Sequence, residues 1–259
     1  MTNQYYVAVV GAGPAGLFGA RELANQGVRV ALFNRDIKPG GLAEYGIYPK
    51  KHTMKDGLRK QFRQIMTLPH LDYYGYVSVG SQGDITLDEL RSFGFDAILV
   101  TAGAQGTKSL GLPGEELEGV YHAKDVVYFY NHLPPFSEKH FHFGKRCAII
   151  GAGNVMVDIA RHLINVQKAE QVTAVVRRGP TEVNFTKDEM KHLISYLDME
   201  EFEREMARVL PVQQVIGQDP EIGRRKILDA LAKADPKTDN AVFEFDFLAS
   251  PIGMVGENG

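Results

Sequence analysis

The sequence predicts an α/β fold that contains two strand–turn–helix units, with the second unit nested after the first. In the first unit, the apolar run Tyr6 to Val10 stops at Gly11, and a helical pattern begins almost at once. In the second unit, the strand Cys147 to Ile150 is followed by a glycine-containing turn and a helical pattern over Asn154 to Val166. Strands that alternate with helices in this way are typical of a parallel sheet covered by helices.

Composition and charge narrow the class of protein. The chain has 259 residues, of which 44% are hydrophobic and 24% charged, and its net charge is -3. This charge predicts no general affinity for nucleic acid or an anionic membrane. We see no apolar run of transmembrane length and no signal peptide, so the expected location is cytoplasmic. The single cysteine, Cys147, excludes an internal disulfide, a redox cysteine pair and a cysteine-ligated iron–sulfur cluster within this sequence.

The first glycine turn has the pattern G-x-G-x-x-G, formed by Gly11, Gly13 and Gly16. The first glycine permits a tight turn, the second lets a pyrophosphate approach the backbone, and the third allows close packing of helix and strand. The helix ends at Gly27, and a second strand follows over Val28 to Phe33. This order predicts a dinucleotide site at the helix N-terminus.

Two features after this second strand leave alternatives open. Asn34 stands where a carboxylate commonly binds the adenosine ribose, and the following Arg35 could instead suit a ribose phosphate. Residues 39–49 are rich in glycine and proline, which predicts a loop. Gly40 and Gly41 would let its backbone approach a flat or phosphorylated ligand, but a plain surface connection fits the same composition.

The segments between the two units alternate between helical and extended patterns. Residues 50–68 predict a helix whose basic side chains form a solvated face, and Thr86 is a plausible N-cap of a short helix. His140 and His142 are interpreted as surface residues, because they have no acidic or cysteine partners at metal-ligand spacing. The other expected elements are strands over 72–79 and 95–100, a connection over 110–117, and a helix over 123–132.

The second glycine turn differs from the first in two ways. Met156 replaces the third glycine of the motif, and the strand Val172 to Val176 ends in Arg177 and Arg178 where an acid would be expected. Two guanidinium groups at the ribose position favour a 2′-phosphate, and therefore NADP over NAD. Further along, helices are expected over 187–196, 200–209 and 221–234, and a strand over 242–248.

Two dinucleotide units in one chain predict two different dinucleotides, of which a flavin and a nicotinamide are the usual pair. The chain resembles the adrenodoxin reductase family of FAD-dependent NADPH–ferredoxin reductases. It is also similar to the small subunit of bacterial glutamate synthase. The resemblance spans nearly the whole chain and rests on the segments VVGAGPAGLFGARELA, PGGLAEYGIYP, FDAILVTAGA, LPGEELEGVYHAKD, IIGAGNVMVDIAR, VVRRGPTEVNFTKDE and FLASP.

The resemblance implies cofactors, a partner and roles for individual residues. Asp158 would lie near the nicotinamide and assist proton movement, and a ferredoxin-type iron–sulfur partner would dock near Arg224 and Arg225. The implied FAD-binding residues are Gly11, Gly13, Ala15, Gly16, Asn34, Gly41, Leu42, Ala102 and Gly103. The implied NADP-binding residues are Gly153, Asn154, Val155, Arg177, Arg178 and Glu189.

The resemblance also implies a domain division and a function. Residues 1–108 would form the N-terminal part of an FAD domain, 109–248 an NADP domain, and 249–259 the start of a return to the FAD domain, which the family completes with a further segment. The expected function is transfer of hydride from NADPH and delivery of electrons to a ferredoxin. The alternatives are an electron-input subunit of a larger iron–sulfur complex and a non-catalytic nucleotide-binding module or inactive fragment.

Overall fold

The computed structural model describes residues 5–104 and 106–256. These residues divide into two compact units. Unit 1 contains the residues up to 108 together with 127–139, and unit 2 contains 109–126 together with the residues from 140 onward. The domain division implied by the resemblance stays a prediction, although its first boundary, after residue 108, coincides with a break between these units. The structure differs over 127–139, which pack with unit 1, and over the described residues after 248, which pack with unit 2.

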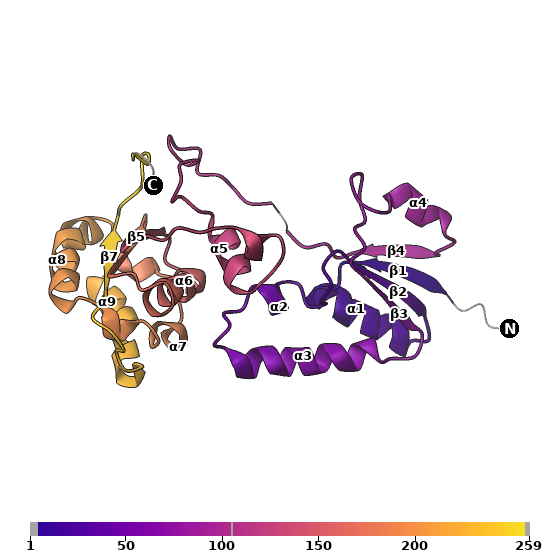
Figure 1. Ribbon diagram of the computed structural model, residues 1–259. Helices are drawn as coiled ribbons and strands as arrows, with labels where there is room; N and C mark the ends of the chain where they lie inside the picture. The colour runs from indigo at the N-terminus through magenta and orange to yellow at the C-terminus, as the bar shows by residue number, and fades with distance from the viewer. Residues whose placement is uncertain (1–4, 105, 257–259) are drawn as a thin grey trace. The chain divides into compact units, whose positions relative to one another are not determined.

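Unit 1 is built on a four-stranded parallel sheet with the strand order β3-β2-β1-β4 (Figure 1). Its strands are β1 (Tyr6–Val10), β2 (Arg29–Asn34), β3 (Leu71–Gly75) and β4 (Ala97–Val100). In β1, Val7 and Val9 belong to one apolar cluster, while Ala8 between them belongs to another. Since successive side chains of a strand point to opposite faces, both faces of the sheet are buried.

Helices cover the two faces of this sheet. Leu17, Phe62 and Ile65 pack on one face, and Leu90 packs on the other. These side chains come from α1 (Pro14–Asn25), α3 (His52–Met66) and α4 (Leu87–Ser92). Helix α4 begins with the predicted Thr86 cap, which forms a complete capping box with Glu89. The 3₁₀ turn Phe136–Glu138 also belongs to unit 1, and α5 (Ala123–Tyr130) crosses the boundary, with residues 123–126 in unit 2 and 127–130 in unit 1.

The prediction that residues 39–49 contain no regular element is wrong. A one-turn helix, α2 (Leu42–Tyr45), lies inside this segment. The amide of Tyr45 donates to the carbonyl of Gly41, and that of Gly46 donates to Leu42. The surrounding glycines and prolines dominate the composition, but the four helical residues themselves impose no barrier to a single turn.

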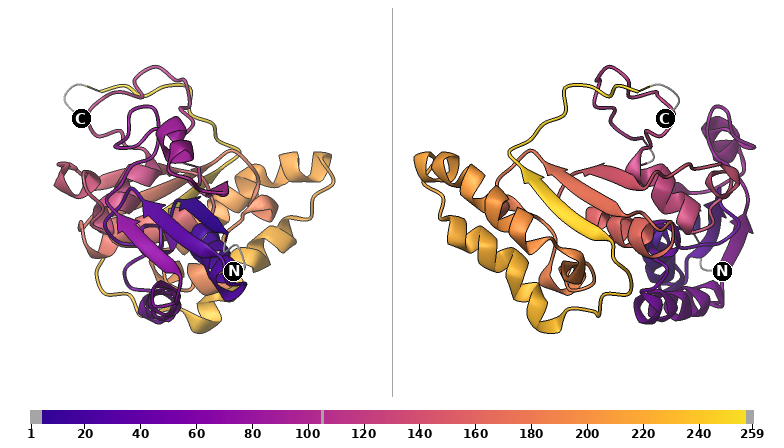
Figure 2. Two further views of the ribbon diagram at one scale, coloured as in Figure 1. Left: turned by 90° about the vertical axis from the view of Figure 1, so that its right-hand side faces the viewer. Right: turned by 60° about the vertical axis from the view of Figure 1, so that its left-hand side comes forward.

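Unit 2 is built on a three-stranded parallel sheet in the order β5-β6-β7. Its strands are β5 (Arg146–Ile150), β6 (Gln171–Val176) and β7 (Val242–Phe247). Figure 2 shows two long helices that run beside one another next to β7: α8 (Met199–Val215) and α9 (Pro220–Leu228). The other helical segments are α6 (Asn154–Asn165), α7 (Lys187–Met190), and the 3₁₀ turns Pro180–Glu182, Ile194–Tyr196 and Asp229–Lys233.

Three helices of unit 2 depart from their predicted bounds, and the one expected over 221–234 is divided into α9 and the 3₁₀ turn Asp229–Lys233. The helix expected over 187–196 is divided into α7 and a 3₁₀ turn. Helix α8 passes through Pro211, although a proline in a helix interior removes one backbone hydrogen bond. Val209 and Gln213 are both fully buried on this helix. We infer that packing of this face outweighs the lost bond.

Candidate functional site

The first glycine turn leaves no room for side chains at two of its glycines. Gly11 has a φ of 105°, and a Cβ there would lie 2.5 Å from the carbonyl oxygen of Thr101. A Cβ on Gly16 would lie 1.8 Å from the carbonyl oxygen of Gly11. The obstructing atoms belong to the backbone and cannot rotate away. Gly11 is therefore required for the turn to lie against the segment after β4, and Gly16 for α1 to pack this closely on the turn.

Gly13 faces a different environment, because a Cβ built on it would meet no described atom within 4 Å. Gly13 is the N-cap of α1, and no side chain of the described residues caps this helix. By contrast, Thr86, Asp198 and Asp219 each cap their helices through side-chain oxygens. An uncapped helix N-terminus has unsatisfied N–H groups and a partial positive charge, which suit a phosphate.

Two further loops reach the same glycine turn. The amide of Gly40 donates to the carbonyl oxygen of Ala12 at 2.7 Å, and a Cβ on Gly41 would lie 3.0 Å from the Cα of Gly13. The Thr101 hydroxyl donates to the carbonyl oxygen of Gly11 at 2.8 Å. The structure therefore brings together the segments of the predicted FAD residues. Of these residues, Ala15, Leu42, Ala102 and Gly103 are exposed.

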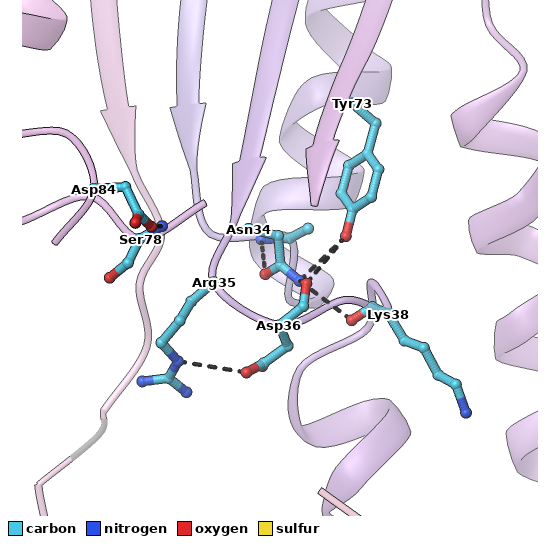
Figure 3. Close-up of polar contacts among 8 residues, drawn as sticks. Asn34, Arg35, Asp36, Lys38, Tyr73, Ser78 and Asp84 are labelled. Carbon is cyan, nitrogen blue, oxygen red and sulfur yellow. Dashed lines mark hydrogen bonds and ion pairs between the residues drawn. The ribbon is translucent and has the colours of Figure 1, made fainter. Parts of the chain in front are cut away.

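Asn34 ties the end of β2 to this turn through its own amide group (Figure 3). Its Oδ1 accepts from the Ala12 amide at 3.1 Å, and its Nδ2 donates to the carbonyl oxygens of Asp36 and Lys38 at 2.7 and 3.2 Å. Nδ2 also lies 3.3 Å from the Tyr73 hydroxyl. A carboxylate could not donate these bonds. The neutral residue therefore organises the loop, and a ribose contact by Asn34 stays a prediction.

A set of buried charges beside the first turn was not anticipated from the sequence. The Arg59 guanidinium binds the Glu44 carboxylate through two hydrogen bonds of 2.8 and 2.7 Å, and this contact lowers the pKa of Glu44. Lys55 is only 6% exposed, its amine donates to Asn131 Oδ1 at 2.9 Å, and burial lowers its pKa. Lys55 therefore does not belong to a solvated face, whereas the Arg59 side chain is partly exposed. The signal in the sequence was their spacing of four residues along one side of the helix.

The second glycine turn repeats the features of the first. Gly151 has a φ of 130°, and a Cβ on Gly153 would meet no described atom within 4 Å. Gly153 is the N-cap of α6, and no described side chain caps this helix either. Met156, at the position of the third glycine, is 3% exposed. The helix–sheet contact thus accommodates the longer side chain, and the phosphate-binding geometry is preserved.

The segment after β6 returns to this second turn. The amide of Asn184 donates to the carbonyl oxygen of Ala152 at 2.9 Å, and the amide of Thr186 donates to Asn154 Oδ1 at 2.9 Å. Arg177 and Arg178 are exposed at the start of this segment. Hydrogen bonds therefore join residues 184 and 186 to the second turn, and Arg177 and Arg178 begin the segment that contains them. Val155 is 52% exposed at the helix start, and Glu189 belongs to α7, which Thr186 caps.

Asp158, the predicted proton-handling residue, is 6% exposed on α6. Arg161 and His162 of the same helix are buried as well. Burial lowers the pKa of His162 to about 4, because the protonated ring loses its hydration. The edge of the Phe143 ring faces the imidazole, with 6.3 Å between ring centroids. His162 had no signal in the sequence, and a catalytic role for Asp158 stays a prediction.

These features define a class: an α/β protein with two glycine turns, each at the N-terminus of a helix that no described side chain caps. A family model described as pyridine nucleotide-disulphide oxidoreductase matches residues 5–201. The chain belongs to this family. It contains one cysteine, so the dithiol pair of a disulfide reductase is excluded within this sequence.

The relatives agree with the predicted resemblance. The chain is 33% identical to the mitochondrial NADPH:adrenodoxin oxidoreductase of Salvelinus fontinalis over 73% of this chain and 42% of that protein. It is 29% identical to the NADPH-ferredoxin reductase FprA of Mycobacterium leprae over 98% of this chain and 61% of that protein. The chain therefore spans about two fifths to three fifths of the length of these relatives.

A solved structure supports the same fold. Mycobacterium tuberculosis FprA in complex with NADPH superposes with a TM-score of 0.81 and 27% identity, covering 99% of this chain and 62% of FprA. The predicted α/β fold with two nucleotide-binding units is confirmed. Among the described residues, no helix is both long and apolar enough to span a bilayer.

Proposed function

We propose that this chain forms part of an FAD-dependent oxidoreductase that takes hydride from NADPH and passes electrons to a ferredoxin-type iron–sulfur partner. The observation that carries the proposal is the pair of glycine turns, each ending at an uncapped helix where a Cβ on the N-cap glycine would point into open space. The named activities of the adrenodoxin and ferredoxin reductases support it.

The first turn fits the FAD pyrophosphate. Gly13, Ala15 and the N-terminus of α1 would hold the phosphates, because the backbone there approaches a ligand without obstruction. Gly41, which packs on the turn, and the adjacent exposed Leu42 would line the flavin. When bound, FAD would supply the chemistry that accepts two electrons as a hydride and releases them one at a time.

The second turn fits NADPH. Gly153, Asn154 and Val155 would hold its pyrophosphate at the start of α6. Arg177 and Arg178 would bind the 2′-phosphate, since a guanidinium matches phosphate geometry with parallel hydrogen bonds. Glu189 would complete the ribose site, and Asp158 would move a proton near the nicotinamide.

The partner surface in this proposal lies near Arg224 and Arg225 on α9. The Arg224 guanidinium pairs with the Glu203 carboxylate of α8, which offsets its charge. Arg225 is exposed, and its Nε donates to the carbonyl oxygen of Glu221 on its own helix. Arg225 is therefore the better candidate to attract an acidic ferredoxin. We also place the protein in the cytoplasm, where its single cysteine would remain reduced.

The test is an anaerobic absorbance titration of the purified chain supplied with FAD. NADPH should bleach the flavin band, and NADH should do so much more weakly. The Arg177→Ala variant should lose this preference while it retains flavin. A chain that takes up no FAD would contradict the proposal, and equal reduction by both nucleotides would contradict the role of the arginines.

A further inference from the structure

The segment that carries the two arginines, residues 177–183, is held by the α8–α9 helix pair. We call this segment the arginine loop. It leaves the end of β6, forms the 3₁₀ turn Pro180–Glu182, and packs against α9. Arg177 and Arg178 are exposed, and the Arg178 guanidinium lies 3.8 Å from the Glu182 carboxylate of the same loop. The loop backbone must therefore be positioned by its neighbours.

The first positioning contact is the approach of α9 at Gly223. This glycine is buried, and a Cβ there would lie 2.7 Å from both the Pro180 carbonyl carbon and the Thr181 nitrogen. Those atoms belong to the backbone of the arginine loop and cannot rotate aside. Helix and loop therefore touch only because residue 223 lacks a side chain.

The second positioning contact is made by Lys226, one turn further along α9. Its amine donates to the carbonyl oxygens of Thr181 and Val183 at 3.1 and 3.0 Å. Gln218, before α9, accepts from the Thr181 hydroxyl at 2.6 Å. One cation thus binds two carbonyl oxygens of the loop backbone, and charge-assisted hydrogen bonds of this kind are stronger than neutral ones.

We infer that Gly223 and Lys226 are positioning residues that set the preference of the second nucleotide site for a 2′-phosphate. They act through the arginine loop and do not touch the nucleotide. Directly after the loop, the amide of Asn184 donates to the carbonyl oxygen of Ala152 in the glycine turn. These contacts at residues 180–184 restrain the loop that begins with Arg177 and Arg178, so less conformational freedom is lost on binding. This inference rests on the proposed binding of NADPH to unit 2.

The experiment compares Lys226→Met and Gly223→Ala with a control variant, Lys233→Met. Lys233 is an exposed lysine of the next 3₁₀ turn, so its replacement removes the same charge without touching the loop. Gly223→Ala favours the helical state of α9, so any loss it causes cannot come from a weaker helix. For each full-length variant, NADP⁺ and NAD⁺ affinities are measured by calorimetry and exchange of the amides of residues 177–183 by mass spectrometry.

We expect both test variants to bind NADP⁺ about tenfold more weakly, a loss typical of misplaced binding groups. Their NAD⁺ affinity should stay unchanged, amide exchange in the arginine loop should become faster, and Lys233→Met should behave as wild type. Equal weakening for both nucleotides, or faster exchange with no change in NADP⁺ affinity, would overturn the inference. A wild-type chain that shows no preference for NADP⁺ would instead refute the proposed nucleotide, and the inference with it.

Discussion

Replacing Asn34 with aspartate should destabilise the protein, although an acid is the residue expected at this position. Asn34 is 6% exposed, and its Nδ2 donates to the carbonyl oxygens of Asp36 and Lys38. In Asn34→Asp a carboxylate oxygen would face both carbonyls. Two hydrogen bonds worth about 1 kcal/mol each are lost, although the Asp36 carbonyl keeps the Tyr76 amide as a donor. We expect a loss of at least about 2 kcal/mol at pH 7.

The pH dependence gives the prediction a second signature. Burial against carbonyl oxygens should raise the pKa of the new carboxyl in the folded state above its unfolded value of about 3.9. The folded variant then binds the proton more tightly than the unfolded chain does. Its stability relative to wild type should therefore recover as the pH falls through the folded pKa, because a protonated acid can donate one bond to Asp36.

The assay is urea denaturation followed by circular dichroism between pH 7 and pH 4. Asn34→Ala is the control without a titratable group: it loses the two Nδ2 bonds and also the Ala12 bond, and its deficit should not change over this pH range. An Asn34→Asp protein that equals wild type at pH 7 and binds FAD more tightly would refute the reasoning. The residue would then act through the ribose and not through the loop.

The remaining predictions concern one glycine and two buried polar residues. Gly16→Ala should abolish FAD uptake and lower the free energy of unfolding by more than about 3 kcal/mol, since its Cβ would overlap the backbone. The control is Gly57→Ala in α3, where a Cβ meets no described atom within 4 Å. In the same denaturation assay, this control should be neutral or stabilise the protein by up to about 1 kcal/mol. Gln213 is fully buried, and neither of its amide atoms has a hydrogen-bond partner within the described chain, so Gln213→Met should raise the free energy of unfolding by about 1–2 kcal/mol; a decrease would show that the amide is satisfied. Because the pKa of His162 is lowered to about 4 in the folded state, the unfolded chain binds a proton there first as the pH falls from about 6.5. Between pH 6.5 and pH 4, wild type should therefore lose up to about 3 kcal/mol more unfolding free energy than His162→Leu. Parallel curves of stability against pH for the two proteins would contradict this.

Local chemistry alone determined much of this protein. The glycine spacing at Gly11 to Gly16 and the apolar strands before it predicted a nucleotide-binding turn, and the structure shows the geometry that such a turn needs. The Thr86 cap followed from a threonine placed three residues before Glu89. Each of these features depends on residues that are neighbours in the chain, so a short stretch of sequence contains the whole physical cause.

Only the tertiary structure decided how polar groups distant in sequence are paired. The direction of the Asn34 amide depends on Ala12 and Tyr73, and the burial of Lys55 depends on Asn131, which lies 76 residues away. The sequence around Gly223 indicates only a helix, and the need for glycine there comes from the backbone of a loop some forty residues earlier, which a Cβ would overlap. Such contacts depend on which elements pack together. A buried amide or ammonium group is costly without a hydrogen-bond partner, so it bonds to whichever partner the fold places beside it.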